Sequence, residues 1–299
     1  MQAAVDGRDV DRVPYVAWHH FHRTPPAGPD SDMADEELRF YDSFKPDLLK
    51  VMHDIDYEKI GDIFEPEDWR SIPVLDPDSG NFGLQLQTLR DIRRRLDPNV
   101  PMIDTVFSVY HYADKLSNGR LLTHLRRDES AVNVGLAAIT ESLRRYARAT
   151  LEAGCEGVYY ALSGASAEGA SRDEYVTTFK KYDHVVLEGV IAAPFNILHM
   201  HGYDGLYFDV VHDLPANAVC WSDRAGGPTL TEARRIHVGC VMGGINEKLF
   251  DQMTPAQITD QGQTSIAEAG RTYFILSPGC SVPDYCSVER LLAIRSAVM

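Results

Sequence analysis

The amino-acid sequence predicts an α/β protein in which residues 1–299 form a single (β/α)8 TIM barrel. Eight short apolar and β-branched segments recur along the chain, and helical patterns separate most of them. A doubly wound open sheet is the alternative, but it usually carries a G-x-G-x-x-G turn, which this sequence lacks. The length of 299 residues is compatible with one barrel domain. We expect strands at 13–20, 47–54, 101–108, 157–164, 196–202, 216–223, 238–245 and 272–280.

Several helices can be located from their ends. Apolar residues recur with helical period over 135–153, and Gly154 follows at the usual position of a C-terminal glycine. Three capping boxes mark further helix starts, because a hydroxyl residue is followed three positions later by Glu or Gln. They pair Ser171 with Glu174, Thr229 with Glu232, and Thr254 with Gln257.

The composition narrows the class of protein. A formal charge of −15 disfavours long-range attraction to nucleic acid or to an anionic membrane, since both would repel the average surface. No apolar run approaches the roughly 20 residues of a membrane helix, and the first residues lack a secretory pattern. The five cysteines are odd in number and widely spaced, which argues against a disulfide framework. We therefore expect a soluble cytoplasmic protein that acts on a small molecule.

Polar residues are concentrated at the carboxyl ends of the expected strands, where barrels of this kind carry their active sites. These residues are His19, His20 and His22 after the first strand, His53 and Asp54 after the second, Tyr160 and Ser163 at the fourth, His199 and His201 at the fifth, Asp223 at the sixth, Asn246 after the seventh and Cys280 after the eighth.

Three of these residues are candidate metal ligands. His199 and His201 are two positions apart in a strand, so both imidazoles can face one centre, and Cys280 leaves the last strand at the same end of the barrel. Two imidazoles and a thiolate with one open position match a catalytic zinc site. Spacing alone slightly favours the alternative interpretation, a polar strand end with satisfied hydrogen bonds and a buried thiol. Cys286 could compete as a ligand, whereas Cys155, Cys220 and Cys240 are interpreted as packing residues.

Four other residues are candidate catalytic groups, namely His20, His53, Asp54 and Tyr160. Titratable groups at a barrel mouth can relay protons or contact substrate, and Asp54 could instead orient a metal-bound imidazole. In an extended chain His20 lies on the same side as His22 and opposite His19. A polar rim is the alternative interpretation for the histidines, and helix capping is the preferred one for Asp223 and Asn246.

Six segments resemble those of one enzyme superfamily over nearly the whole chain. His199-x-His201-Gly202 is similar to a His-x-Cys-Gly motif, and Pro278-Gly-Cys280 to a final Pro-Gly-Cys. The other four are Asp11-Arg-Val-Pro14, the helix-to-strand junction at 151–158, the strand-seven segment at 239–246 and the helix start at 254–258. Their order and spacing resemble the uroporphyrinogen decarboxylase (URO-D) superfamily, and within it the zinc-dependent methyltransferase branch.

The resemblance implies a TIM barrel and a zinc ion that activates a thiol to accept a methyl group from a corrinoid protein. His199 and Cys280 match zinc ligands of that branch, whereas His201 stands where the branch has a cysteine. Imidazole in place of thiolate makes the site more positive and a stronger Lewis acid, which could suit an oxygen acceptor. The chain shows no corrinoid-binding module, so the corrinoid protein would be a separate partner, and the resemblance also implies a homodimer.

Two alternative functions follow from the same resemblance. The founding decarboxylase holds its substrate carboxylates with arginines after the first strand, where this chain keeps only Arg23 as a fixed cation. The first alternative is a metal-independent decarboxylase of a small or porphyrinogen-type carboxylic acid. For an acid with one carboxylate, Asp54 or a histidine of the first loop would be the proton donor. The second alternative is a barrel that binds a ligand without catalysis. The short loop from Thr24 to Asp35 leads us to expect a less covered barrel mouth.

Overall fold

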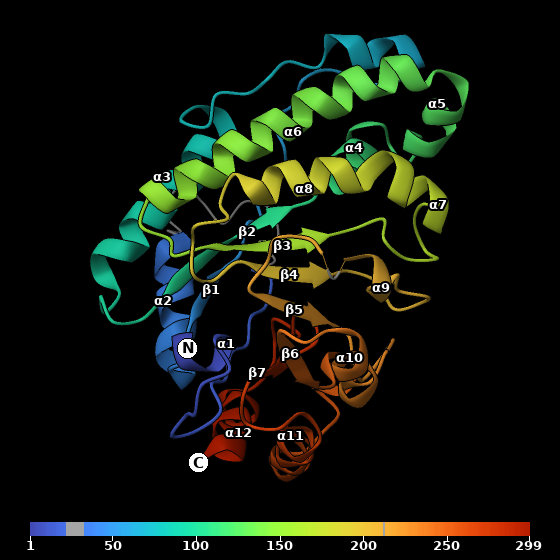
Figure 1. The fold of residues 1–299 in the computed structure, drawn as a ribbon. Coiled ribbons are helices and arrows are strands. Elements are labelled where there is room, and N and C mark those ends of the chain that lie inside the picture. Colours follow the sequence, from blue (N-terminus) through green and yellow to red (C-terminus); the bar gives the residue numbers. More distant parts are fainter. Residues whose placement is uncertain (22–32, 212) are drawn as a thin grey trace.

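Seven parallel strands form one curled sheet in which the order of the strands follows the chain (Figure 1). The computed structural model describes residues 1–21, 33–211 and 213–299. Each strand lies inside one of the expected segments, from the second to the eighth. The strands are β1 Leu49–Val51, β2 Met102–Phe107, β3 Val158–Leu162, β4 Ile197–Met200, β5 Ala218–Trp221, β6 Cys240–Ile245 and β7 Phe274–Pro278.

The first expected strand, 13–20, is the exception, so the strict eight-stranded prediction is wrong for the described residues. This segment runs between β7 and the start of β1 and forms only isolated bridges, such as that of Tyr15 with Leu276. Pro14 has no amide hydrogen to donate, and the Tyr15 amide donates to the Asp47 carboxylate at 3.0 Å. A regular ladder cannot extend there, although Val16 donates to the Leu276 carbonyl at 3.0 Å and Asp47 to the Tyr15 carbonyl at 3.1 Å.

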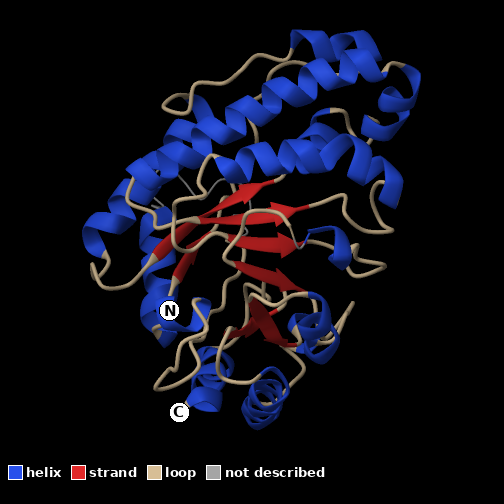
Figure 2. Ribbon diagram, in the orientation of Figure 1, coloured by secondary structure: helices blue, strands red, loops and turns tan. Residues whose placement is uncertain are grey.

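Helices surround the sheet on its outer side (Figure 2). All three capping boxes form, and α6 covers the helix predicted over 135–153, with Gly154 beyond its end at a φ of +101°. The helices and helical turns are α1 Gln2–Val5, α2 Met33–Phe44, η1 Pro66–Ser71, α3 Gly80–Arg95, α4 Val109–Leu116, α5 Leu121–Arg127, α6 Glu129–Glu152, α7 Arg172–Glu174, η2 Tyr175–Phe179, α8 Lys180–Glu188, α9 Phe208–Val211, α10 Leu230–Ile236, η3 Glu247–Leu249, α11 Pro255–Ala269 and α12 Val288–Val298. None of them, over the described ranges, is long and apolar enough to cross a membrane.

The two faces of the sheet carry separate clusters of buried residues. On the outer face, strand residues such as Val51, Tyr160 and Leu198 belong to the same cluster as the core residues of the helices. On the inner face, strand residues join Trp18 in a second cluster. Because side chains alternate along a strand, each strand contributes to both faces. Inner-face members are Leu48, Met52, Ile103, Tyr159, Ile197, Ala218, Cys220, Cys240, Met242 and Ile275.

Candidate active site

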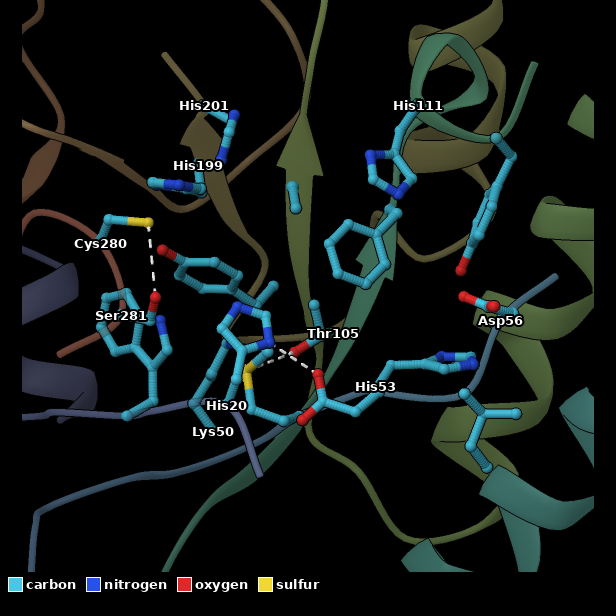
Figure 3. A pocket seen from close by; sticks show the side chains of 18 of the residues that line it. His20, Lys50, His53, Asp56, Thr105, His111, His199, His201, Cys280 and Ser281 are labelled. Carbon is cyan, nitrogen blue, oxygen red and sulfur yellow. Dashed lines mark hydrogen bonds and ion pairs between the residues drawn. The ribbon is translucent and has the colours of Figure 1, made fainter. Parts of the chain in front are cut away.

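A pocket of about 400 Å³ lies at the carboxyl ends of the strands, where the sequence predicts the active site (Figure 3). Six of the seven predicted site residues line it, and only Tyr160 does not. The predicted lining residues are His20, His53, Asp54, His199, His201 and Cys280. The curled sheet therefore brings together residues that are up to 260 positions apart, from His20 to Cys280.

His199 and His201 lie on the inner face at the end of β4, as their spacing predicts. Their rings are 5.9 Å apart between centroids and nearly perpendicular, and Figure 3 shows Cys280 on the same side of the pocket. The His199 ring stacks on Tyr159 at 5.2 Å. Its Nδ1 is buried and has no hydrogen-bond partner among the described residues. Burial lowers the pKa of His199 and raises that of the Cys280 thiol, so both are held in their neutral forms.

The three candidate ligands do not form a ready-made metal site. Within residues 1–21, 33–211 and 213–299, no three His, Cys, Asp or Glu side chains are grouped so that they could hold a metal ion. The donor types nevertheless suit zinc, and the unpartnered Nδ1 of His199 is a buried nitrogen that a metal would satisfy. Binding a metal ion would therefore require these side chains to move closer together.

His20 and Asp54 form a hydrogen-bonded pair at the pocket. The His20 Nδ1 lies 2.7 Å from Asp54 Oδ1, and the backbone N–H of Phe21 donates to the other carboxylate oxygen at 2.8 Å. Burial by itself would raise the pKa of Asp54, but the hydrogen bonds from His20 and Phe21 outweigh it and lower the pKa. Asp54 is thus an ionised acceptor that orients the His20 ring.

The structure places His53 and Tyr160 differently from the prediction that both are catalytic. The His53 ring reaches the edge of the pocket but faces the helices, with Nδ1 3.2 Å from the Tyr146 hydroxyl of α6. Tyr160 lies on the outer face, where its hydroxyl donates to Asp183 of α8 at 2.5 Å. The prediction for Tyr160 missed the strand phase by one residue, since its neighbour Tyr159 lines the pocket.

The pocket also contains residues that sequence reasoning missed, foremost Lys50 of β1. Its position was detectable, because a lysine in the middle of an apolar strand, two residues before Met52 and four before Asp54, must share their face. His111 of α4 is a second missed residue, and its ring stacks on Phe107 at 4.5 Å. Burial lowers the pKa of His111 to about 4.

The remaining predicted residues lie outside the pocket. His19 packs between Phe21 and Phe40, opposite His20 as predicted, and His22 lies outside the described residues. Asn246 caps η3 as expected, by accepting from the Leu249 N–H at 3.1 Å. The capping interpretation of Asp223 is wrong, because its carboxylate accepts from the Gly244 N–H of β6 at 2.9 Å.

Cysteine and loop predictions have mixed outcomes. Cys155, Cys220 and Cys240 are buried, as the packing interpretation predicts, and Cys286 lines a separate groove beside His19. The expected short loop from Thr24 to Asp35 lies mostly outside the described residues, so the predicted openness of the mouth stays a prediction.

The fold and the pocket together define an α/β enzyme of the barrel type with its site at the carboxyl ends of parallel strands. Residues 57–299 match the family model described as uroporphyrinogen decarboxylase (URO-D). The chain therefore belongs to the URO-D family. The Asp11–Pro14 motif precedes the matched region, whereas the motifs around His199 and Cys280 lie inside it.

Similar solved structures support the same fold. A methyltransferase from Methanosarcina mazei has a TM-score of 0.82 at 16% identity, covering 99% of this chain and 96% of that chain. A B12-independent methionine synthase from a Shewanella species, in complex with selenomethionine, has a TM-score of 0.53 at 13% identity, covering 71% of this chain and 64% of that one. A putative vitamin-B12-independent methionine synthase from Listeria monocytogenes has a TM-score of 0.57 at 12% identity, covering 89% and 85%. At these identities the likeness shows the fold alone. No curated protein sequence matches the chain.

Proposed function

We propose that the protein is a zinc-dependent methyltransferase that moves a methyl group between a separate corrinoid protein and a small acceptor, a thiol or an oxygen compound. The observation that carries the proposal is the convergence of His199, His201 and Cys280 in one pocket of a URO-D family barrel. The fold likeness to a methyltransferase from Methanosarcina mazei supports the same reaction class.

His199, His201 and Cys280 would hold the zinc ion, with His199 Nδ1 as the first ligand because it is buried and unpartnered among the described residues. Zinc bound there would supply Lewis acidity that lowers the pKa of a substrate thiol or hydroxyl. Tyr159 stacks on His199 and restricts the rotation of its ring, which positions this ligand. Replacement of His199 or Cys280 should therefore affect metal binding more than folding.

His20 and Asp54 would handle the proton that the acceptor loses. The Asp54 carboxylate lies 2.7 Å from His20 Nδ1 and would orient the ring, so that its other nitrogen could accept that proton. The 17% exposure of the Asp54 side chain and 35% exposure of His20 leave a route to solvent for that proton.

The experiment that tests this proposal is elemental analysis of the purified protein, followed by a methyl-transfer assay with methylcobalamin and small thiols. We expect about one zinc per chain in the wild type and its loss in His199→Ala and Cys280→Ala. The matched controls are His184→Ala and Cys286→Ala, which change the same residue types outside the pocket and should keep the metal.

Two outcomes would count against the proposal. A wild type without zinc after reconstitution would exclude this mechanism and leave the metal-independent decarboxylase, with Asp54 or His20 as proton donor. Zinc that persists in both ligand variants would place the metal elsewhere in the chain.

A further inference from the structure

Lys50 is a buried cation on the inner face of the sheet. It belongs to β1, is 3% exposed and contributes to the wall of the pocket. The interior of such barrels is usually filled by branched apolar side chains, so a lysine in this layer is unusual. Figure 3 shows it on the side of the pocket that also carries Ser281 and Cys280, away from His53 and Asp56.

The side chains that contact Lys50 attract its positive charge but do not neutralise it. Its ammonium group lies over the rings of Trp18 at 5.2 Å and Tyr159 at 4.6 Å, and it donates to the sulfur of Met52. Aromatic faces attract a cation through their quadrupole, and a thioether is a weak acceptor. No carboxylate among the described residues forms an ion pair with Lys50.

Glu37, the acidic group that acts most strongly on Lys50, is already engaged. The Glu37 carboxylate accepts from the Met52 backbone N–H at 2.7 Å, and burial raises its pKa to about 8. Burial likewise lowers the pKa of Lys50 to about 8, while Glu37 and Asp54 act in the opposite direction. A buried cation without a bonded anion is costly, so an anion that enters the pocket would gain a strong, partly desolvated interaction.

The other lysine of the pocket does not offer this interaction. Lys115 of α4 is exposed and forms an ion pair with Asp56, so its charge is compensated within the protein. Among the described lining residues, Lys50 and Lys115 are the two lysines, and no arginine lines the pocket. The pocket therefore presents one uncompensated lysine to a bound molecule.

We propose that Lys50 binds the anionic group, a carboxylate or a sulfonate, of the small substrate that occupies this pocket. One such cation in about 400 Å³ fits a small monoanion and disfavours a polycarboxylate such as a porphyrinogen. Lys50 and Cys280 line the same side of the pocket, which places the anionic end of the substrate close to the candidate metal ligands. The inference rests on the proposed function in taking this pocket as the substrate site.

The test compares anions with neutral molecules of the same shape. Dissociation constants of propionate against propionamide, and of ethanesulfonate against ethanesulfonamide, are measured by NMR titration for the wild type, Lys50→Met and Lys115→Met. We expect the wild type to prefer at least one anion by about tenfold or more, and Lys50→Met to lose this preference while its affinity for the neutral partner changes less than about twofold. Lys115→Met, the matched control, should keep the preference.

The neutral ligands separate loss of charge from loss of structure, because a distorted pocket would weaken both members of a pair. The two acids distinguish a carboxylate site from a sulfonate site. Lys50→Arg keeps the charge and should keep a preference for the anion if Lys50→Met does not fold. A wild type without anion preference, or a Lys50→Met variant that retains it, would overturn the inference.

Zinc content of the same samples keeps the two proposals distinguishable. Lys50→Met should retain the metal of the wild type while it loses anion selectivity, and His199→Ala should do the reverse. Loss of zinc in the wild type with an intact anion preference would remove the methyltransferase proposal and leave the role of Lys50 standing.

Discussion

Two adjacent tyrosines of β3 have very different hydrogen-bond partners, because one lies on the outer face of the sheet and the other on the inner face. Tyr160, on the outer face, donates to Asp183 at 2.5 Å, and Tyr175 donates to the other oxygen of the same carboxylate at 2.9 Å. Tyr159, on the inner face, has only the weak acceptor Cys220 Sγ at 3.5 Å and lies beside Lys50 and His199. The hydroxyl of the outer-face tyrosine is thus strongly paired, whereas that of its inner-face neighbour is weakly paired.

This difference separates polar groups that the protein itself pairs from groups with weak or missing partners. On the outer face, Asp104 accepts from Tyr146 at 2.6 Å and from Gln85 at 2.9 Å. On the inner face, His199 Nδ1 has no partner among the described residues, and Lys50 has a sulfur and two rings. An incompletely satisfied buried group is a cost that a bound ligand or metal can remove.

The largest effect on stability is expected when a lysine is introduced on the outer face of the sheet, as a counterpart of Lys50 on the inner face. Val241→Lys would place an ammonium group among apolar residues, since Val241 is fully buried on the outer face between Val219 and Phe274 of the neighbouring strands. We expect a loss of about 4 kcal/mol or more in the free energy of unfolding, measured by urea denaturation, because neither of these strand neighbours has a polar side chain to accept from the ammonium group. A fold that tolerates this lysine as well as it tolerates Lys50 would contradict the distinction between the faces.

A pH-dependent effect is expected from the outer-face carboxyl of Asp183. Burial raises its pKa to about 7, against an ordinary value of 3.8. The folded state therefore binds the proton more tightly than the unfolded chain, so this contribution to stability is complete below pH 3.8 and is lost as the pH rises through 7. Asp183→Asn has no such titration.

The measurement is the difference in unfolding free energy between the wild type and Asp183→Asn at several pH values from 4 to 7.5. We expect this difference to move in favour of the variant by about 2–4 kcal/mol as the pH rises, since one pKa unit corresponds to about 1.4 kcal/mol. A difference that does not change with pH would show that Asp183 titrates alike in both states.

Removal of one hydroxyl from each of the two adjacent tyrosines provides a smaller and closely matched contrast. Tyr160→Phe takes a donor from the buried Asp183 and should cost about 1.5–3 kcal/mol, whereas Tyr159→Phe loses a weak bond to sulfur and should cost less than about 1 kcal/mol. Chemical denaturation of both variants checks the order. Equal costs would mean that hydrogen-bond pairing does not distinguish the faces.

Much of the fold was accessible from the sequence because periodicity and capping are local properties. Seven of the expected strands, the three capping boxes and the helix ending before Gly154 all form. The segment at 13–20 failed as a strand for a non-local reason, since the Asp47 carboxylate captures the amide that a ladder would need. Side-chain competition of this kind has no signature in one segment of sequence.

The sequence predicts residues of the candidate site only where it shows which side chains of a strand face the pocket. His199 and His201 are two positions apart and therefore share a face, and both line the pocket. Tyr159 and Tyr160 are identical neighbours, so the sequence alone does not indicate which of the two faces the pocket. Lys50 lies inside an apolar strand and not at its end, so the rule that active-site residues follow the strands does not identify it.

The smallest effect on stability is expected for Lys50→Met, the substitution that removes the charge from the inner face. The methionine side chain is long enough to fill much of the space, and it removes the desolvation cost of a buried ammonium group, whereas the contacts with Trp18 and Tyr159 lose their cation–π component. We expect these terms nearly to cancel, so that the free energy of unfolding changes by less than about 1 kcal/mol, in the stabilising direction. Urea denaturation at pH 7 without added anions measures this change, and repetition with propionate or ethanesulfonate should stabilise the wild type but not the variant. A loss of more than about 2 kcal/mol without ligand would instead show that Lys50 is paired within the protein and holds the inner face together.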